Sequence, residues 1–264
     1  MIKYKDVKNK CLEGRFFKYD NWRDKLFVPP SIFLIWFFLN IGLNANAVSI
    51  LSGLLAILCG FLMSFSDPLL IFIGSFGYVI FYLLDYVDGG VARYHGKSGI
   101  GGQYLDWIMH VVVTVGITTG IFIGALQSTG LWIIPFGILC IISSLLTFDK
   151  HSYAWYSIIM YYQQNKVKGK INKEIKLRDK LFHHNFLTKS LKAVSLILFH
   201  ENYTIFFYPV LGLINLYFND YFDFRVIIVV WGGSFYFIYN IWDLIKISKS
   251  KVIDKRYNET FIKK

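Results

Sequence analysis

The sequence predicts an all-α, polytopic membrane protein with six transmembrane helices and an N-terminal interfacial helix. Three observations support this fold class: a very apolar composition, apolar runs that recur along the chain, and basic residues gathered in a few segments. Apolar residues make up 55% of the 264 positions and aromatic residues 19%, which is more than an ordinary soluble domain of this length carries. The chain is therefore expected to be an integral membrane protein.

Six apolar runs are spaced along the chain, and each reaches or approaches the ~20 residues of a bilayer-spanning helix once its flanks are included. The runs cover residues 47–65, 69–84, 111–126, 131–146, 203–218 and 226–242. We therefore predict six spans within one transmembrane domain at residues 44–245.

Basic residues indicate the orientation of these spans. Of the 28 Lys and Arg residues, eight lie in residues 1–30, ten in 150–192 and seven in 246–264. Basic loops stay on the cytoplasmic side, so both termini and the 150–192 loop are predicted to be cytoplasmic, with the protein in the cell (inner) membrane. Basic segments of this kind contact anionic lipid headgroups, and without interleaved aromatic residues they do not indicate a nucleic-acid partner.

The N-terminal region, residues 1–43, is predicted to be a cytoplasmic arm followed by an interfacial helix, and residues 246–264 a basic cytoplasmic tail. Pro29 and Pro30 are expected to end the polar arm. Residues 31–43 are apolar but only about half a bilayer long, which favours a helix lying at the interface. Asn46 is placed where the N-cap of the first span is expected.

The polar stretch from Asp85 to His110, DYVDGGVARYHGKSGIGGQYLDWIMH, lies between two very apolar segments. The second span is expected to continue through it to about Tyr94, and a glycine-rich turn then reverses the chain at the cytoplasmic side. The third span begins near Gln103. The two helices are therefore predicted to be antiparallel neighbours.

Helical periodicity predicts which side chains meet. At 100° per residue, Asp85 and Asp88 share one stripe with Gly89 and Ala92, and Arg93 lies beside it. On the next helix Gly102, Asp106 and His110 follow at i, i+4 and i+8. The two stripes are expected to face each other near the cytoplasmic surface.

Three carboxylates that converge inside a membrane protein need a positive partner. Hard divalent cations accept carboxylate oxygens, so Asp85, Asp88 and Asp106 are predicted to hold one or two Mg²⁺ or Mn²⁺ ions. The small residues Gly89, Ala92 and Gly102 leave room for a ligand beside the helix backbones, and the Arg93 guanidinium can bind phosphate oxygens. Cations, arginine and glycine together form a layout for phosphoryl transfer.

The same stretch resembles the motif of the CDP-alcohol phosphotransferase (CDP-alcohol phosphatidyltransferase) family, Asp-x2-Asp-Gly-x2-Ala-Arg-x8-Gly-x3-Asp-x3-Asp. Seven positions match at every spacing, namely Asp85, Asp88, Gly89, Ala92, Arg93, Gly102 and Asp106. The stretch from Asn46 to Ser49 resembles the family's Pro-Asn-x-x-Thr motif, with Ala45 in place of the proline and Ser49 in place of the threonine. His110 stands where the family has its last aspartate.

The resemblance implies an enzyme of phospholipid or related phosphodiester synthesis with its active site at the cytoplasmic side. An acceptor hydroxyl would attack the β-phosphorus of a CDP-alcohol, taken to be CDP-diacylglycerol, and release CMP. Arg93, Ala92 and the Gly89 and Gly102 surface would seat the nucleotide. The family also implies two metal ions, a membrane lipid substrate and a homodimer.

His110 is expected to act together with Asp106 as a catalytic residue. In the family the last aspartate is associated with the metal site and with deprotonation of the acceptor hydroxyl. A neutral imidazole also takes a proton near neutral pH, and general-base assistance is commonly worth about 10²–10⁴-fold. Imidazole is a poorer Mg²⁺ ligand than carboxylate, so the substitution leaves the occupancy of a second metal position open.

Three other functions are compatible with parts of the sequence. A divalent-cation transporter would spread polar residues through the bilayer depth, whereas here they cluster at one side. An intramembrane aspartyl protease would carry a Gly-x-Gly-Asp element, which the sequence lacks. A catalytically silent membrane scaffold of the same fold is compatible with the exchange at His110, and CMP release from a CDP-alcohol separates the enzyme from all three.

Overall fold

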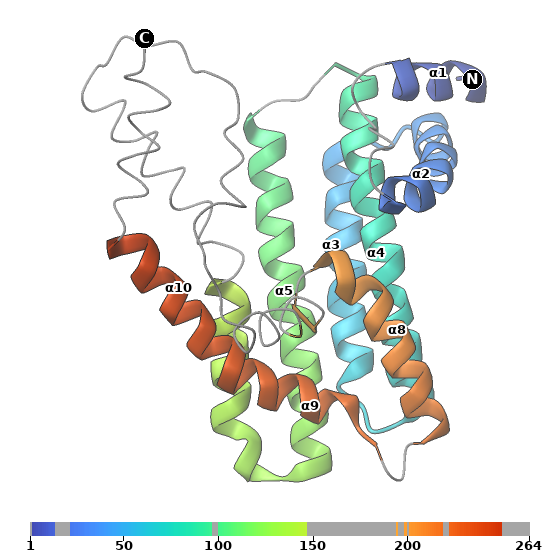
Figure 1. Ribbon diagram of the computed structural model, residues 1–264. Coiled ribbons are helices and arrows are strands. Elements are labelled where there is room, and N and C mark those ends of the chain that lie inside the picture. Colours follow the sequence, from blue (N-terminus) through green and yellow to red (C-terminus); the bar gives the residue numbers. More distant parts are fainter. Residues whose placement is uncertain are drawn as a thin grey trace.

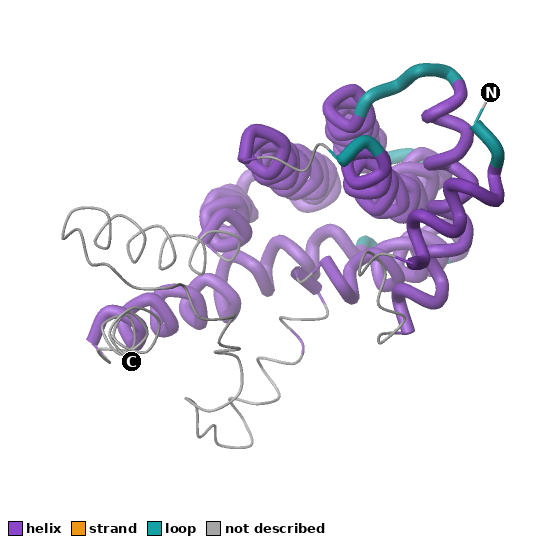
Figure 2. The backbone as a smooth tube through the Cα atoms, turned by 90° about the horizontal axis from the view of Figure 1, so that it is seen from above, coloured by secondary structure: helices purple, strands orange, loops and turns teal. Residues whose placement is uncertain are grey.

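The computed structural model describes residues 2–13, 22–96, 100–146, 194, 198–199, 201–218 and 222–249, and the regular elements among them are all helices (Figure 1). Figure 2 shows the same helices from above, with the described loops and turns in teal. The predicted loop at 150–192 and most of the predicted tail at 246–264 lie outside the described residues. The labelled helices are α1 (Tyr4–Glu13), α2 (Trp22–Asn40), α3 (Ala45–Met63), α4 (Pro68–Tyr94), α5 (Ile100–Thr129), the 3-10 turn η1 (Leu131–Ile133), α8 (Glu201–Tyr217), α9 (Phe224–Trp231), the π-helical turn η2 (Gly232–Tyr236) and α10 (Phe237–Lys249). Residues 134–146, which follow η1, are also helical.

Apolar helices lie at all six positions where spans were predicted. Within the described residues, four are long and apolar enough to cross a membrane: Ala45–Met63, Pro68–Tyr94, Tyr104–Thr129 and Phe224–Ile245. The other two positions hold the shorter apolar helices Leu131–Leu146 and Phe206–Tyr217. The all-helical class and an integral membrane protein are thus supported, with four candidate spans in place of the six predicted.

The prediction that Pro29 and Pro30 end the polar arm is wrong, because α2 begins at Trp22 and continues through both prolines. Each proline removes one backbone donor from the helix. Burial offsets this cost, since Val28 and Ile35 are fully buried in a cluster that α2 forms with α4. A helix of 19 residues therefore replaces the short one that was expected.

The N-cap of the first span is Asn44 and not Asn46. Asn44 has an extended backbone, and its side chain accepts a hydrogen bond from the Ala47 amide at 2.9 Å. The helix consequently starts two residues earlier, and Asn46 lies in its first turn. Beyond the other end of α3, Asp67 caps α4 by accepting from the amides of Leu69 and Leu70.

The central element of the bundle is α3, which packs along both α4 and α5. Glycines permit the contact with α5: a Cβ on Gly120 would lie 2.7 Å from Cα of Gly60, and one on Gly53 would lie 2.7 Å from the Met109 sulfur. The backbones of α4 and α5 have few close approaches to each other. The two helices are antiparallel as predicted, but α3 determines their relative position.

The end of the bundle away from α1 contains a buried arginine. Arg225, at the start of α9, is 2% exposed and forms two contacts with Asp223, from Nε to Oδ1 at 2.9 Å and from Nη2 to Oδ2 at 2.7 Å. Its Nη1 donates to the carbonyl of Met63, the last residue of α3, at 2.9 Å. Ser128 of α5 donates to the same Asp223 carboxylate. Three helices are therefore joined at this end by one charged group.

Candidate active site

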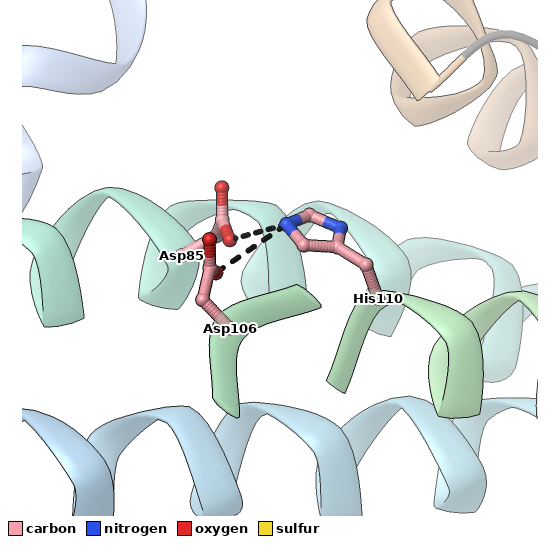
Figure 3. A group of neighbouring side chains, drawn as sticks. All are labelled: Asp85, Asp106 and His110. Atoms are coloured by element: carbon pink, nitrogen blue, oxygen red, sulfur yellow. Dashed lines mark ion pairs between the residues drawn. The ribbon is translucent and has the colours of Figure 1, made fainter. Parts of the chain in front are cut away.

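Three titratable side chains from α4 and α5 meet near the end of the bundle where α4 finishes (Figure 3). His110 Nε2 lies 3.0 Å from Asp85 Oδ1 and 3.5 Å from Asp106 Oδ1. The His110 side chain is 16% exposed, that of Asp85 26% and that of Asp106 48%. The exposure increases towards Asp106, so a ligand can reach the group from that side.

These three side chains form a donor set that fits a divalent cation. Each offers one ligand atom, and the three atoms lie within 4.8 Å of one another. Neighbouring ligands of a six-coordinate ion with bonds of about 2.1 Å are about 3 Å apart, and opposite ligands about 4.2 Å. The two distances from His110 Nε2 agree with the spacing of neighbouring ligands. Carboxylate oxygens suit Mg²⁺ and Mn²⁺, and imidazole nitrogen suits the softer Mn²⁺ better than Mg²⁺.

Asp88, the third predicted metal ligand, has a different neighbour. It is 7% exposed and accepts a hydrogen bond of 2.6 Å from the Ser49 hydroxyl of α3. It still lies close enough to Asp85 and Asp106 to be repelled by their charges. The structure thus brings Asp85 and Asp106 together with His110, whereas the hydrogen bond of Asp88 goes to Ser49 of α3.

The predicted nucleotide-binding residues fall into two groups. Gly89 makes room for Arg93, because a Cβ there would lie 3.0 Å from Arg93 Nη1 and 3.1 Å from Nη2. The space beside Gly89 is therefore occupied by the guanidinium. Gly102 is exposed, and a Cβ there would meet no atom within 4 Å, while Ala92 is half-buried. An open surface remains beside Gly102 on α5.

Ser49 and Phe81 are the neighbours of the site to which the sequence analysis gave no role. Phe81 is buried, and its ring lies edge-on to the His110 imidazole with a centroid distance of 6.2 Å. Ser49 is separated from Asp88 by 39 positions in the chain, so no local periodicity relates the two. The one sequence signal for Ser49 was its place in the Asn46–Ser49 stretch.

Comparison with known proteins identifies the domain that contains these residues. Residues 42–172 match the family model described as CDP-alcohol phosphatidyltransferase. No curated protein matches the chain. The matched segment includes α3, α4 and α5 and with them every side chain of the candidate site. The chain therefore contains a domain of the CDP-alcohol phosphatidyltransferase family at residues 42–172.

Proposed function

We propose that the protein transfers a phosphatidyl-type group from CDP-diacylglycerol to the hydroxyl of an acceptor alcohol and releases CMP. The family implies the general reaction, transfer of a phosphoalcohol group from a CDP-alcohol to an alcohol. The observation that supports it best is the meeting of Asp85, Asp106 and His110 from two helices at ligand spacing. The particular donor is part of the proposal.

The side chains of the site divide the work as follows. Asp85, Asp88 and Asp106 would hold divalent cations, Mg²⁺ or Mn²⁺ and two in number, which supply positive charge to the diphosphate when bound. The Arg93 guanidinium and the open surface at Gly102 would seat the nucleotide diphosphate. The bond that breaks joins the β-phosphorus to the CMP oxygen, and the bond that forms joins this phosphorus to the acceptor oxygen.

His110 would take the proton of the acceptor hydroxyl as this bond forms. Asp85 Oδ1, at 3.0 Å from Nε2, then stabilises the positive imidazole. The runs 131–146, 203–218 and 226–242 contain no Lys or Arg, and Arg225, which directly precedes the last run, is paired with Asp223. A neutral or zwitterionic acceptor is therefore proposed, because no free cation in these runs is placed to bind a phosphorylated one.

The test is CMP release by purified protein supplied with labelled CDP-diacylglycerol, other CDP-alcohols and a panel of alcohols, with Mg²⁺ or Mn²⁺. Asp85→Asn and Asp106→Asn are expected to lower the rate by at least about 10²-fold, because each removes a ligand charge from the site. Asp67→Asn is the matched control: it is the same substitution at the other end of α4, and Asn still caps a helix.

Normal turnover by Asp85→Asn would refute the metal assignment. Absence of CMP with every donor would favour the silent scaffold. Passage of Mn²⁺ into liposomes without CMP release would favour the transporter.

The distances also support a second role for His110, as a nitrogen ligand of the ion. Pulsed EPR of the Mn²⁺-loaded protein distinguishes the two roles, because it detects coupling of the metal to a bound imidazole nitrogen. If His110 is a ligand, the nitrogen coupling disappears in His110→Asp while Mg²⁺-dependent turnover increases, because the site becomes all-oxygen. If His110 is only the base, wild type shows no nitrogen coupling, and His110→Ala loses about 10²–10⁴-fold in rate.

The remaining features are proposed on the sequence and the family together. The catalytic domain covers residues 44–245, with a cytoplasmic arm and interfacial helix before it at 1–43 and a cytoplasmic tail after it at 246–264. Both termini and the active site face the cytoplasm in the cell (inner) membrane. The enzyme acts as a homodimer, which cross-linking in native membranes would test.

A further inference from the structure

We propose that Ser49 is a positioning residue of the active site, which orients the Asp88 carboxylate for the bound cation. This inference rests on the proposed function, since it concerns the same metal-binding carboxylates. Ser49 does not itself touch the ion or the substrate in this proposal. It acts through Asp88, from a third helix that contributes no metal ligand.

The contact between Ser49 and Asp88 is short and shielded from solvent. Ser49 Oγ lies 2.6 Å from Asp88 Oδ2, and the two residues are 6% and 7% exposed. The hydroxyl also lies 3.2 Å from the carbonyl of Ala45, one turn earlier in α3. A hydroxyl has one proton to donate, and an ionised carboxylate is the stronger acceptor at the shorter distance. The proton therefore belongs to the bond with Asp88.

This bond decides how Asp88 presents its two oxygens. Ser49 donates to Oδ2, and Oδ1 is the oxygen that would bind the ion in this proposal. Without the hydroxyl, a buried carboxylate near Asp85 and Asp106 would lose its side-chain donor and keep only the backbone contact with Gly89, while the repulsion of the two charges would remain. The carboxylate would then turn away or take up a proton, and in either form it is a poorer ligand. Removing a partner of this kind commonly weakens metal binding by about 10–100-fold.

The position of Ser49 on α3 gives the contact a second consequence. Gly53, one turn further along α3, lies against Met109 of α5, next to His110 in the chain. One turn of α3 therefore touches both ligand-bearing helices, through a hydrogen bond to α4 and through van der Waals contact to α5. The Ser49 bond therefore fixes Asp88 relative to α3, and through the contact of α3 with α5 also relative to Asp106 and His110.

The experiment measures Mn²⁺ binding to the purified full-length protein without substrate, by the loss of the free Mn²⁺ EPR signal during titration. Ser49→Ala is expected to raise the Kd for Mn²⁺ by about 10–100-fold. The side chains of threonine and valine have nearly the same shape and differ in the hydroxyl. Ser49→Thr should therefore retain most of the affinity, and Ser49→Val should lose it. This pair remains informative if the alanine variant does not fold, and thermal unfolding reports on stability separately.

Ser52→Ala is the matched control. Ser52 is also buried in α3, and its hydroxyl donates at 2.7 Å to the Ser49 carbonyl within the same helix. It should leave the Kd unchanged. The double variant Ser49→Ala with Asp88→Asn completes a cycle. If Ser49 acts through Asp88, removing the hydroxyl has no further effect once the carboxylate is gone.

Four results would overturn the proposal. Ser49→Ala could bind Mn²⁺ with wild-type affinity, or Ser49→Thr and Ser49→Val could lose affinity equally. The losses in the double variant could be additive, or the wild-type protein could bind no Mn²⁺. Failure of the proposed function gives a different result. The Mn²⁺ titrations would then show the Ser49 effect while no CDP-alcohol yields CMP.

Discussion

At the scale of single residues, the three carboxylates of the site differ in the side chain that lies against them. Asp85 and Asp106 face an imidazole, whereas Asp88 faces a hydroxyl from another helix. Asp85 and Asp106 can therefore bind one ion together, with His110 either as a third ligand or next to the ion. Asp88 is held in place before any ion binds. The different surroundings explain why equal substitutions at Asp85 and Asp88 need not have equal effects on metal binding.

Gly102 allows a residue-scale prediction about the donor. Gly102→Ala should keep the unfolding temperature of wild type or raise it slightly, because a Cβ would meet no atom within 4 Å and alanine favours the helix by up to about 1 kcal/mol. If the nucleotide packs against this surface, the KM for the CDP-alcohol should rise about tenfold or more, since overpacking commonly costs about 1–3 kcal/mol. Steady-state kinetics and thermal unfolding check the two parts.

The control for this prediction is Gly101→Ala. Gly101 is also exposed, and a Cβ there would also meet no atom within 4 Å, but it is not one of the fixed positions of the motif. A KM that does not change in Gly102→Ala, or that changes equally in both variants, contradicts a nucleotide contact at Gly102.

The residues of the site could be predicted from sequence where a local pattern connects them. Helical spacing placed Asp106 and His110 on one face of α5, and the motif brought Asp85 to the same place. The link between Ser49 and Asp88 could not be predicted in this way, because it depends on how α3 packs against α4. Gly89 shows the same limit, since the pattern indicated an open space there but not that Arg93 fills it.

At the scale of elements, α3 determines how the two ligand-bearing helices lie relative to each other, although it supplies no metal ligand. It packs along α4 and α5, and the latter contact depends on the absence of side chains at Gly60 and Gly120. A change in this packing would shift Asp106 and His110 relative to Asp85. The geometry of the site is therefore sensitive to residues well away from it.

Gly120→Ala tests this dependence. A Cβ there would lie 2.7 Å from Cα of Gly60, which is backbone and cannot move aside easily. We expect the unfolding temperature to fall by about 5–10 °C and Mn²⁺ affinity to weaken. Gly116→Ala, one turn earlier on α5, is the control, because its Cβ would meet Ile57 at an ordinary 3.6 Å. Equal behaviour of the two variants would show that helix packing does not limit the site.

The elements themselves could be predicted to different degrees. Apolar runs located the helices, since hydrocarbon length is a property of the local sequence. The ends were less certain: two prolines did not stop α2, because its buried face outweighs the lost hydrogen bonds. The place of α3 between α4 and α5 was not predicted, since periodicity reports a helix face and not which helix covers it.

At the scale of the whole molecule, the two ends of the bundle have opposite characters. The carboxylate group lies towards the end where α4 finishes, and the Arg225 group joins α3, α5 and α9 at the other end. The distribution of basic residues predicts that the first end is cytoplasmic. The orientation is accessible to direct measurement.

Cysteine labelling in intact cells tests this topology. In a Cys11→Ser background, Ser66→Cys in the exposed turn before α4 should react with a membrane-impermeant maleimide, and His95→Cys in the exposed turn after α4 should react only after lysis. Cys59 and Cys140 are buried and should contribute little signal. The reverse labelling pattern would invert the proposed orientation.

The bidentate pairing of Arg225 with Asp223 also bears on biogenesis. Arg225 is the single basic residue near the predicted outer face, where a lone cation would oppose delivery of the hairpin between α8 and α9 across the bilayer. Paired with Asp223, it adds no net charge to the hairpin; Asp223 accepts from its Nε and Nη2, while its Nη1 donates to the Met63 and Phe65 carbonyls at the end of α3. On the predicted orientation, a neighbouring acid thus allows an arginine to join α3, α5 and α9 on the side of the membrane where basic residues are rare.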